Sequence, residues 1–156
     1  MIDLARLALK TQTDLRQQSN IEIDAPRYIT LTRTATLAIA TTGTLIVWQS
    51  EVRNVGGFTW SGSNITIPVS GYYLIDMAWN YNSASVTTVD VIVNGTDTGR
   101  SSLYYGGGTR NRATFTRYFT ALDTLAITVT VVAGRTMQVS AYGTSYESPF
   151  LHIVKV

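Results

Sequence analysis

The sequence has no cysteine and a single histidine, His152, among its 156 residues. The absence of cysteine excludes a disulfide framework and a thiolate metal site. His152 has no adjacent carboxylate in the sequence, so no catalytic triad or histidine metal site is readable. We therefore expect a packed or interface histidine in a protein that is not an enzyme and uses no metal and no cofactor.

Acidic and glycine-rich patterns give no further sign of chemistry. Four aspartates could converge on a calcium ion after folding: Asp76, Asp90, Asp97 and Asp123. They lack the loop spacing of a calcium site, and no carboxylate pair is spaced for glycoside hydrolysis. The glycine run 106–108 lacks the lysine and the strand-to-helix context of a phosphate loop, so we expect a flexible hairpin tip there.

Charge is also scarce. Charged residues make up 14% of the chain, against about 25% in an average soluble domain. So few charges favour a protein that hides part of its surface in an assembly. The net charge of +2 is too small for a nucleic-acid-binding protein. Lys10 and Lys155 are the only lysines, and arginine, which supplies the other positive charges, suits fixed interface contacts.

Residues 2 to about 18 contain helix-forming residues without strand-like alternation, and they predict a short helix. Its larger apolar side chains are Ile2, Leu4, Leu7, Leu9 and Leu15. Because a helix this short is not stable alone, we expect it to pack on something. It could lie on its own domain, fray, or form a short trimeric bundle; the reading we carry forward is an anchor to a partner.

The start of the chain does not read as a targeting segment. Asp3, Arg6 and Lys10 interrupt its apolar residues, which argues against a secretory signal peptide, and no transmembrane run follows. We expect synthesis in a cytoplasm and no membrane partner. Since no linker marks a second globular domain, we divide the chain into an N-terminal helix and arm, 1–26, and a β domain, 27–156.

After Pro26 the sequence is rich in the strand formers Thr, Val, Ile and Tyr. Turn residues such as Asn94-Gly95 recur at short intervals. The candidate strands are 28–34, 36–40, 44–49, 64–67, 71–81, 86–94, 98–105, 112–120, 125–132, 136–142 and 149–155. Many short strands at this spacing predict an antiparallel sandwich or jelly roll.

Two of the candidate strands are apolar on both faces. Segment 71–81 has an apolar core face formed by Tyr73, Ile75, Met77, Trp79 and Tyr81. Its opposite face is not properly polar, because it carries Tyr72, Leu74 and Ala78 beside Asp76 and Asn80. The last strand alternates Phe150, His152 and Val154 with Leu151 and Ile153. Antiparallel strands normally expose one face to water. Both strands therefore need a second burial partner, which a neighbouring subunit would supply.

Segment 46–73 carries turn formers and strand formers in a fixed order. They are Asn54, Gly56, Gly57, Phe58, Gly62, Ile65, Ile67, Pro68, Gly71 and Tyr73. This order resembles the complement C1q/TNF-like jelly-roll superfamily, in which an asparagine, a glycine pair, an aromatic and a glycine turn precede an alternating strand and Pro-x-x-Gly-x-Tyr. The resemblance continues through VIVNG at 91–95, ALDTL at 121–125 and the last strand, and covers roughly residues 28 to 156.

The resemblance implies an all-β, ten-stranded antiparallel jelly roll, here preceded by the short N-terminal α-helix, and a tight homotrimer. In that fold the strand after the Pro-x-x-Gly turn and the final strand lie nearest the threefold axis. These are the two strands with apolar outer faces. The expected trimer interface contains Tyr72, Leu74, Ala78, Phe150, His152 and Val154. A cyclic trimer that buries such a surface would be obligate.

Animal members of this superfamily are secreted and often carry a collagen stalk and disulfides. This sequence has a short leading helix instead, and it is similar in that respect to small virion proteins of tailed bacteriophages. The resemblance therefore suggests a virion protein assembled in the host bacterial cytoplasm. Our first hypothesis is a trimeric capsid decoration (cement) protein whose N-terminal arm binds the major capsid protein or another virion protein.

A second hypothesis is the receptor-binding tip or an adaptor of a phage tail or head fibre, which would contact a host surface glycan or protein. The possible ligand loop would contain Tyr104, Tyr105, Arg110 and Arg112, because arginine beside aromatic residues suits such contacts. The reading that we favour for this segment is an ordinary solvated hairpin. A third hypothesis, a jelly-roll enzyme, lacks the expected metal ligands.

Overall fold

The computed structural model describes residues 25–97, 105–139 and 149–156, and these residues are all-β. The twelve strands within them are β1 (Tyr28–Thr32), β2 (Leu37–Ile39), β3 (Thr44–Leu45), β4 (Ser50–Val55), β5 (Thr59–Ser61), β6 (Asn64–Thr66), β7 (Gly71–Val93), β8 (Thr96–Asp97), β9 (Tyr105–Phe119), β10 (Thr124–Val131), β11 (Arg135–Gln138) and β12 (Phe150–Lys155). The predicted N-terminal helix and most of the arm, 1–26, lie outside the described residues. In the described part no helix is long and apolar enough to span a bilayer.

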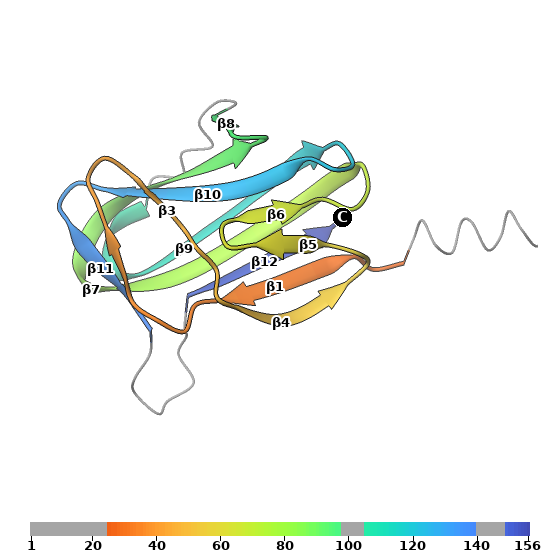
Figure 1. The fold of residues 1–156 in the computed structure, drawn as a ribbon. Helices are drawn as coiled ribbons and strands as arrows, with labels where there is room; N and C mark the ends of the chain where they lie inside the picture. The colour runs from red at the N-terminus through yellow and green to blue at the C-terminus, as the bar shows by residue number, and fades with distance from the viewer. Residues whose placement is uncertain (1–24, 98–104, 140–148) are drawn as a thin grey trace, which may run out of the picture.

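The first layer of the fold has the antiparallel order β4-β1-β12-β7-β9 and uses the first half of β7 (Figure 1). β12 pairs with β7 from Phe150 opposite Ala78 to Lys155 opposite Tyr73. β9 pairs along the other side of β7 and ends with Phe119 opposite Gly71. β7 and β12, the two strands that read as apolar on both faces, are therefore direct neighbours inside this layer.

The second layer uses the other half of β7. This half pairs with β10 from Val93 opposite Leu125 to Thr87 opposite Val131, and β10 also pairs with β6 and β3. The register between β7 and β9 shifts between Asn80 and Ser85. At this irregularity β7 leaves the first layer and enters the second, so that one antiparallel sheet folds over as a sandwich (Figure 1).

The core between the layers follows the two-residue period of the strands. Tyr73, Ile75, Met77 and Trp79 on the first half of β7 are at most 1% exposed. Val89 and Val91 continue the same face into the second layer and are fully buried. Each such side chain contributes about 1.5–3 kcal/mol by leaving water, so the inward face of β7 anchors both layers.

The residues that carry the superfamily resemblance have structural roles. The Asn54 amide donates to the Phe58 carbonyl at 2.9 Å and so closes the turn at the glycine pair. The Tyr73 hydroxyl donates to the Val69 carbonyl at 2.8 Å behind the Pro-x-x-Gly turn. Asn94 donates to the Asp123 carboxylate at 2.7 Å and ties two turns together. Asp123 is thus engaged in turn closure.

The all-β prediction and the jelly-roll prediction are confirmed, with differences in detail. The predicted strands 71–81 and 86–94 are one continuous strand of 23 residues. The edge strand β4 was not predicted, because its sequence SEVRNV is polar and three of its side chains are exposed. The expectation of a flexible tip at 106–108 is wrong, since the backbone of these glycines belongs to β9.

Gly56 provides a test of the turn geometry. Its φ is +94°, and a Cβ there would lie 2.5 Å from Arg27 Cγ. Gly95 also has a positive φ, +73°, but a Cβ there would meet nothing within 4 Å. We expect Gly56→Ala to lower the free energy of unfolding by about 2–4 kcal/mol and Gly95→Ala by about 1 kcal/mol. Urea unfolding measures both, and equal losses would contradict the predicted clash with Arg27.

Candidate self-association surface

The first layer has an outer face that points away from the core. Because neighbouring strands are paired in register, outward residues form rows across β1, β12, β7 and β9. We call the following residues the outer face: Tyr28, Thr30 and Thr32; Phe150, His152 and Val154; Tyr72, Leu74, Asp76, Ala78 and Asn80; and Arg110, Arg112, Thr114, Thr116 and Tyr118. Arg53 and Val55 extend it onto β4, opposite Thr30 and Tyr28.

The fold brings together the six residues predicted for an interface. Leu74 lies opposite Val154, and Ala78 lies opposite Phe150. His152 lies opposite Asp76 between these two rows, and Tyr72 adds an aromatic ring at the end of the face. The six residues therefore share one surface; their role in binding another subunit stays a prediction.

One end of the outer face is aromatic and open to solvent. Tyr72 and Tyr118 are 58% and 54% exposed, although each presents a large apolar ring. Their rings pack edge to face with centroids 5.3 Å apart, so each holds the other in place. A fixed pair of exposed aromatic rings is typical of a binding surface.

The centre of the outer face is polar, and its carboxylate is largely shielded from water. Asp76 is 8% exposed although it points away from the core. Its carboxylate accepts hydrogen bonds from Arg112 Nε at 2.8 Å and Nη2 at 2.6 Å, and from the Thr114 hydroxyl at 2.8 Å. Such a two-point contact fixes the planes of both groups. The carboxylate is thereby satisfied within the chain.

The pKa of Asp76 reflects this environment. Burial alone raises the pKa of a carboxyl group, and it is the largest single influence on Asp76. The hydrogen bonds from Arg112 and Thr114 act in the opposite direction, together with the charges of Arg112 and His152. These favourable contacts prevail, so the pKa of Asp76 lies below its ordinary value of 3.8.

His152 is held beside this carboxylate. Its Nδ1 is 2.8 Å from the Thr30 hydroxyl, and its ring lies 5.9 Å from the ring of Tyr28. Tyr28 in turn carries the Arg53 guanidinium at 5.2 Å from its ring centroid. The imidazole is thus packed between Thr30 and Tyr28 on the outer face, and a role for His152 in an interface stays a prediction.

The predicted ligand loop is placed differently from our expectation. Arg110 and Arg112 lie in β9, opposite Asn80 and Ala78, because residues 105–119 form a strand and not a loop. Arg112 is bound to Asp76 on the outer face. Tyr104 lies outside the described residues, and for Tyr105 the structure describes the backbone alone. The prediction of a loop at Arg110 and Arg112 is therefore wrong.

The sequence analysis missed Thr114 and Tyr118 as members of this surface. In segment 110–119 Asn111, Ala113 and Phe119 are buried, and the residues that alternate with this face are exposed. The strand itself was predicted, as 112–120, but its outward residues were not assigned to the interface. The anchor residues Ile2, Leu4, Leu7, Leu9 and Leu15 lie outside the described residues.

Among the described residues, no three His, Cys, Asp or Glu side chains gather as metal ligands would.

Comparison with known proteins places this geometry in a fold family. No family model and no curated protein matches the sequence. Three solved structures that it resembles are murine APRIL at pH 5.0, with a TM-score of 0.60, Eiger TNF from S. frugiperda, with 0.55, and PRD1 vertex protein P5, with 0.62. Each is 16% identical; the alignments cover 83–84% of this chain and 99%, 91% and 96% of those chains, respectively.

The fold is a C1q/TNF-like jelly roll. At 16% identity the likeness establishes the architecture alone. The jelly roll confirms the resemblance predicted from Asn54, the glycine pair and the Pro-x-x-Gly-x-Tyr segment.

The Asp76–Arg112 pair predicts a pH-dependent cost of mutation. Arg112→Met keeps the aliphatic stem but leaves the buried carboxylate without its cation, which should cost about 1–2 kcal/mol at pH 7. The folded pKa of Asp76 is lowered, so the pair stabilises the protein above pH 3.8 and this contribution is lost as the pH falls through the folded pKa. The stability difference between wild type and variant should therefore shrink in acid.

Arg110→Met is the matched control, since Arg110 lies on the same strand and Asp76 is bound by Arg112 and Thr114 instead. Thermal unfolding between pH 3 and pH 7 checks the prediction. An Arg112→Met penalty that stays constant across this range would show that the carboxylate is not what Arg112 stabilises.

Proposed function

We propose that the chain is a structural protein of a phage virion and that it trimerises through the outer face. The observation that carries the proposal is the composition of this face, which combines Leu74, Ala78, Phe150 and Val154 with an ion pair that is satisfied within the chain. The likeness to PRD1 vertex protein P5 supports the virion assignment. The superfamily resemblance supports the threefold arrangement.

The outer face is suited to burial against another copy. A buried charge without a partner costs several kcal/mol, and Asp76 avoids that cost because Arg112 and Thr114 already bind it. The apolar rows on either side of Asp76 can then be buried without leaving its carboxylate unpaired. Leu74 and Val154 lie in one row, next to the aromatic pair Tyr72 and Tyr118, and together they supply the hydrophobic contribution to association.

Within the virion, the protein acts as a decoration (cement) protein. A trimer presents three N-terminal arms, residues 1–26, whose apolar side chains bind the major capsid protein. Each bound trimer joins several capsid subunits. Because the trimer binds only the assembled lattice, its binding free energy adds to the stability of the shell. The proposed location is the phage particle, assembled in the bacterial cytoplasm, and the partners are the chain itself and the capsid.

The first test concerns the outer face. Leu74→Glu places a carboxylate in the apolar row opposite Val154 and should convert the trimer to monomers, because a charge buried in the interface has no partner. Leu45→Glu is the control, since Leu45 is 43% exposed on β3 in the second layer. Light scattering on a sizing column should give about three times the 17.1 kDa chain mass for wild type and control. A monomeric wild type would refute trimerisation.

The second test concerns the arm. Deleting residues 1–18 should abolish binding to heads of the phage that encodes the protein, since the proposed anchor is removed, while light scattering still shows a trimer. Sedimentation of the protein with purified heads measures the binding. Decoration of the heads by the truncated trimer would show that another surface holds the capsid.

A further inference from the structure

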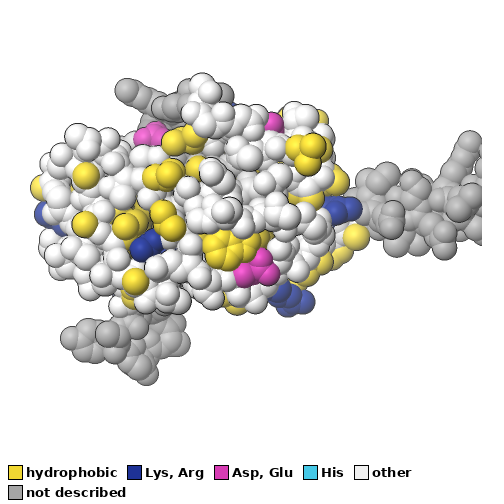
Figure 2. Space-filling model, in the orientation of Figure 1, with side chains coloured by type: hydrophobic (Ala, Val, Ile, Leu, Met, Phe, Trp, Pro, Cys, Tyr) yellow, Lys and Arg dark blue, Asp and Glu magenta, His cyan; other side chains and the backbone are white. Residues whose placement is uncertain are grey.

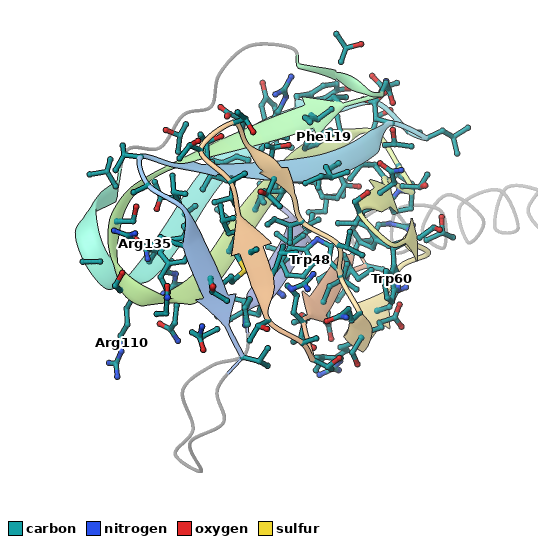
Figure 3. All side chains as sticks on the ribbon, turned by 60° about the vertical axis from the view of Figure 1, so that its left-hand side comes forward. Trp48, Trp60, Arg110, Phe119 and Arg135 are labelled. Atoms are coloured by element: carbon teal, nitrogen blue, oxygen red, sulfur yellow. The ribbon has the colours of Figure 1, made fainter. Side chains whose placement is uncertain are left out.

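A second surface lies at the seam between the two layers, away from the outer face. β4 and β5 are the two ends of the strand order, and they come together where the sheet folds over. One side-chain hydrogen bond joins them, from Trp60 Nε1 on β5 to Glu51 Oε2 on β4 at 2.9 Å. Figure 3 shows Trp60 on this side of the molecule. Figure 2 shows an acidic side chain beside a broad hydrophobic patch over this region.

Trp60 differs from the other two tryptophans. Trp48 and Trp79 are 2% and 1% exposed and belong to the core. Trp60 packs against the core from outside and remains half-buried. Its indole is therefore held in place by the core on one side and by Glu51 at its N–H, while part of the ring reaches solvent. A fixed, partly exposed tryptophan is the residue type most often found at the centre of binding sites.

Glu51 is an exposed carboxylate that is fixed but not neutralised. Its Oε2 accepts from Trp60 Nε1 and from Asn54 Nδ2 at 3.1 Å. Neither donor carries a charge, and within the described residues Glu51 forms no ion pair. The nearby cation on the same strand, Arg53, lies over the ring of Tyr28 instead. The seam therefore presents a negative charge beside an indole ring.

We propose that the Trp60–Glu51 seam is a docking site for a cationic side chain, arginine or lysine, of a partner protein. The electron-rich face of an indole attracts cations more strongly than any other aromatic ring, and the carboxylate beside it adds a charge of the matching sign. An anion would be repelled by both groups. This site goes beyond the proposed virion role and does not depend on it, because its residues lie off the outer face.

The small size of the site makes simple cations suitable probes. We would titrate the full-length protein with Nα-acetyl-arginine amide and with choline, and follow tryptophan fluorescence. Trp60 dominates any fluorescence change caused by a dissolved probe, because the other two indoles are buried. The neutral isosteres Nα-acetyl-citrulline amide and 3,3-dimethylbutan-1-ol are the matched control ligands, and methyl glucoside tests a saccharide. Both cations should bind at least about threefold more tightly than their isosteres.

Two variants separate a binding site from a structural seam. Glu51→Gln keeps an oxygen acceptor for Trp60 and should weaken cation binding at least about threefold while the unfolding midpoint changes little. Trp60→Phe keeps an aromatic ring and should still bind the cations. Because this variant lacks the fluorescent indole, amide chemical shifts measured by NMR detect the binding instead. Added salt should weaken binding to wild type but not the residual binding to Glu51→Gln.

The outcomes are distinct. Binding of methyl glucoside without cation binding would make this a saccharide site and overturn the proposal. Equal binding of cations and isosteres, or no binding of any probe, would leave the Trp60–Glu51 bond as a structural closure only. Neither result bears on trimer formation. That property is tested separately, by the sizing-column mass of Leu74→Glu, which changes the outer face.

Discussion

β7 is the element on which the rest of the structure depends, because this one strand runs through both layers. Its two-residue period continues through the bend, so Tyr73 and Val91 face the same core although they belong to different layers. The same period sends Leu74, Asp76 and Ala78 to the outside of the first layer. Core and outer face are thus set by a single register, and a slip of one residue would exchange them.

The Asp76–Arg112 contact determines what the outer face can do. Apolar residues on both sides favour burial, but an acidic residue in the middle of a buried surface would oppose it. The two-point bond from Arg112 and the Thr114 hydroxyl resolve this conflict inside one chain. A buried ion pair adds little net stability over apolar side chains of similar volume, but it restricts how two surfaces can be matched.

The sequence predicted the alternating faces because strand periodicity is local. The apolar outer residues of β7 and β12 could be read from segments 71–81 and 149–155, and the fold places them side by side. The partner of Asp76 could not be predicted, because Arg112 lies 36 residues away and the pairing of two strands so far apart leaves no local signal in the sequence. β4 and β5 were missed for another reason. They are short, polar edge strands, and their positions depend on how distant segments pack and not on a local pattern.

The two candidate surfaces have different physical characters, and this difference constrains their roles. The outer face is broad, and its central carboxylate, Asp76, is neutralised by Arg112 within the chain, which suits permanent association between identical chains. The Trp60–Glu51 seam is small, and its carboxylate has no ion-pair partner among the residues that the structure describes, which suits a single charged contact that salt can weaken. A trimer formed through the outer face would leave three such seams at its sides. It could then bind neighbouring cationic side chains on a lattice of matching symmetry without disturbing its own interface.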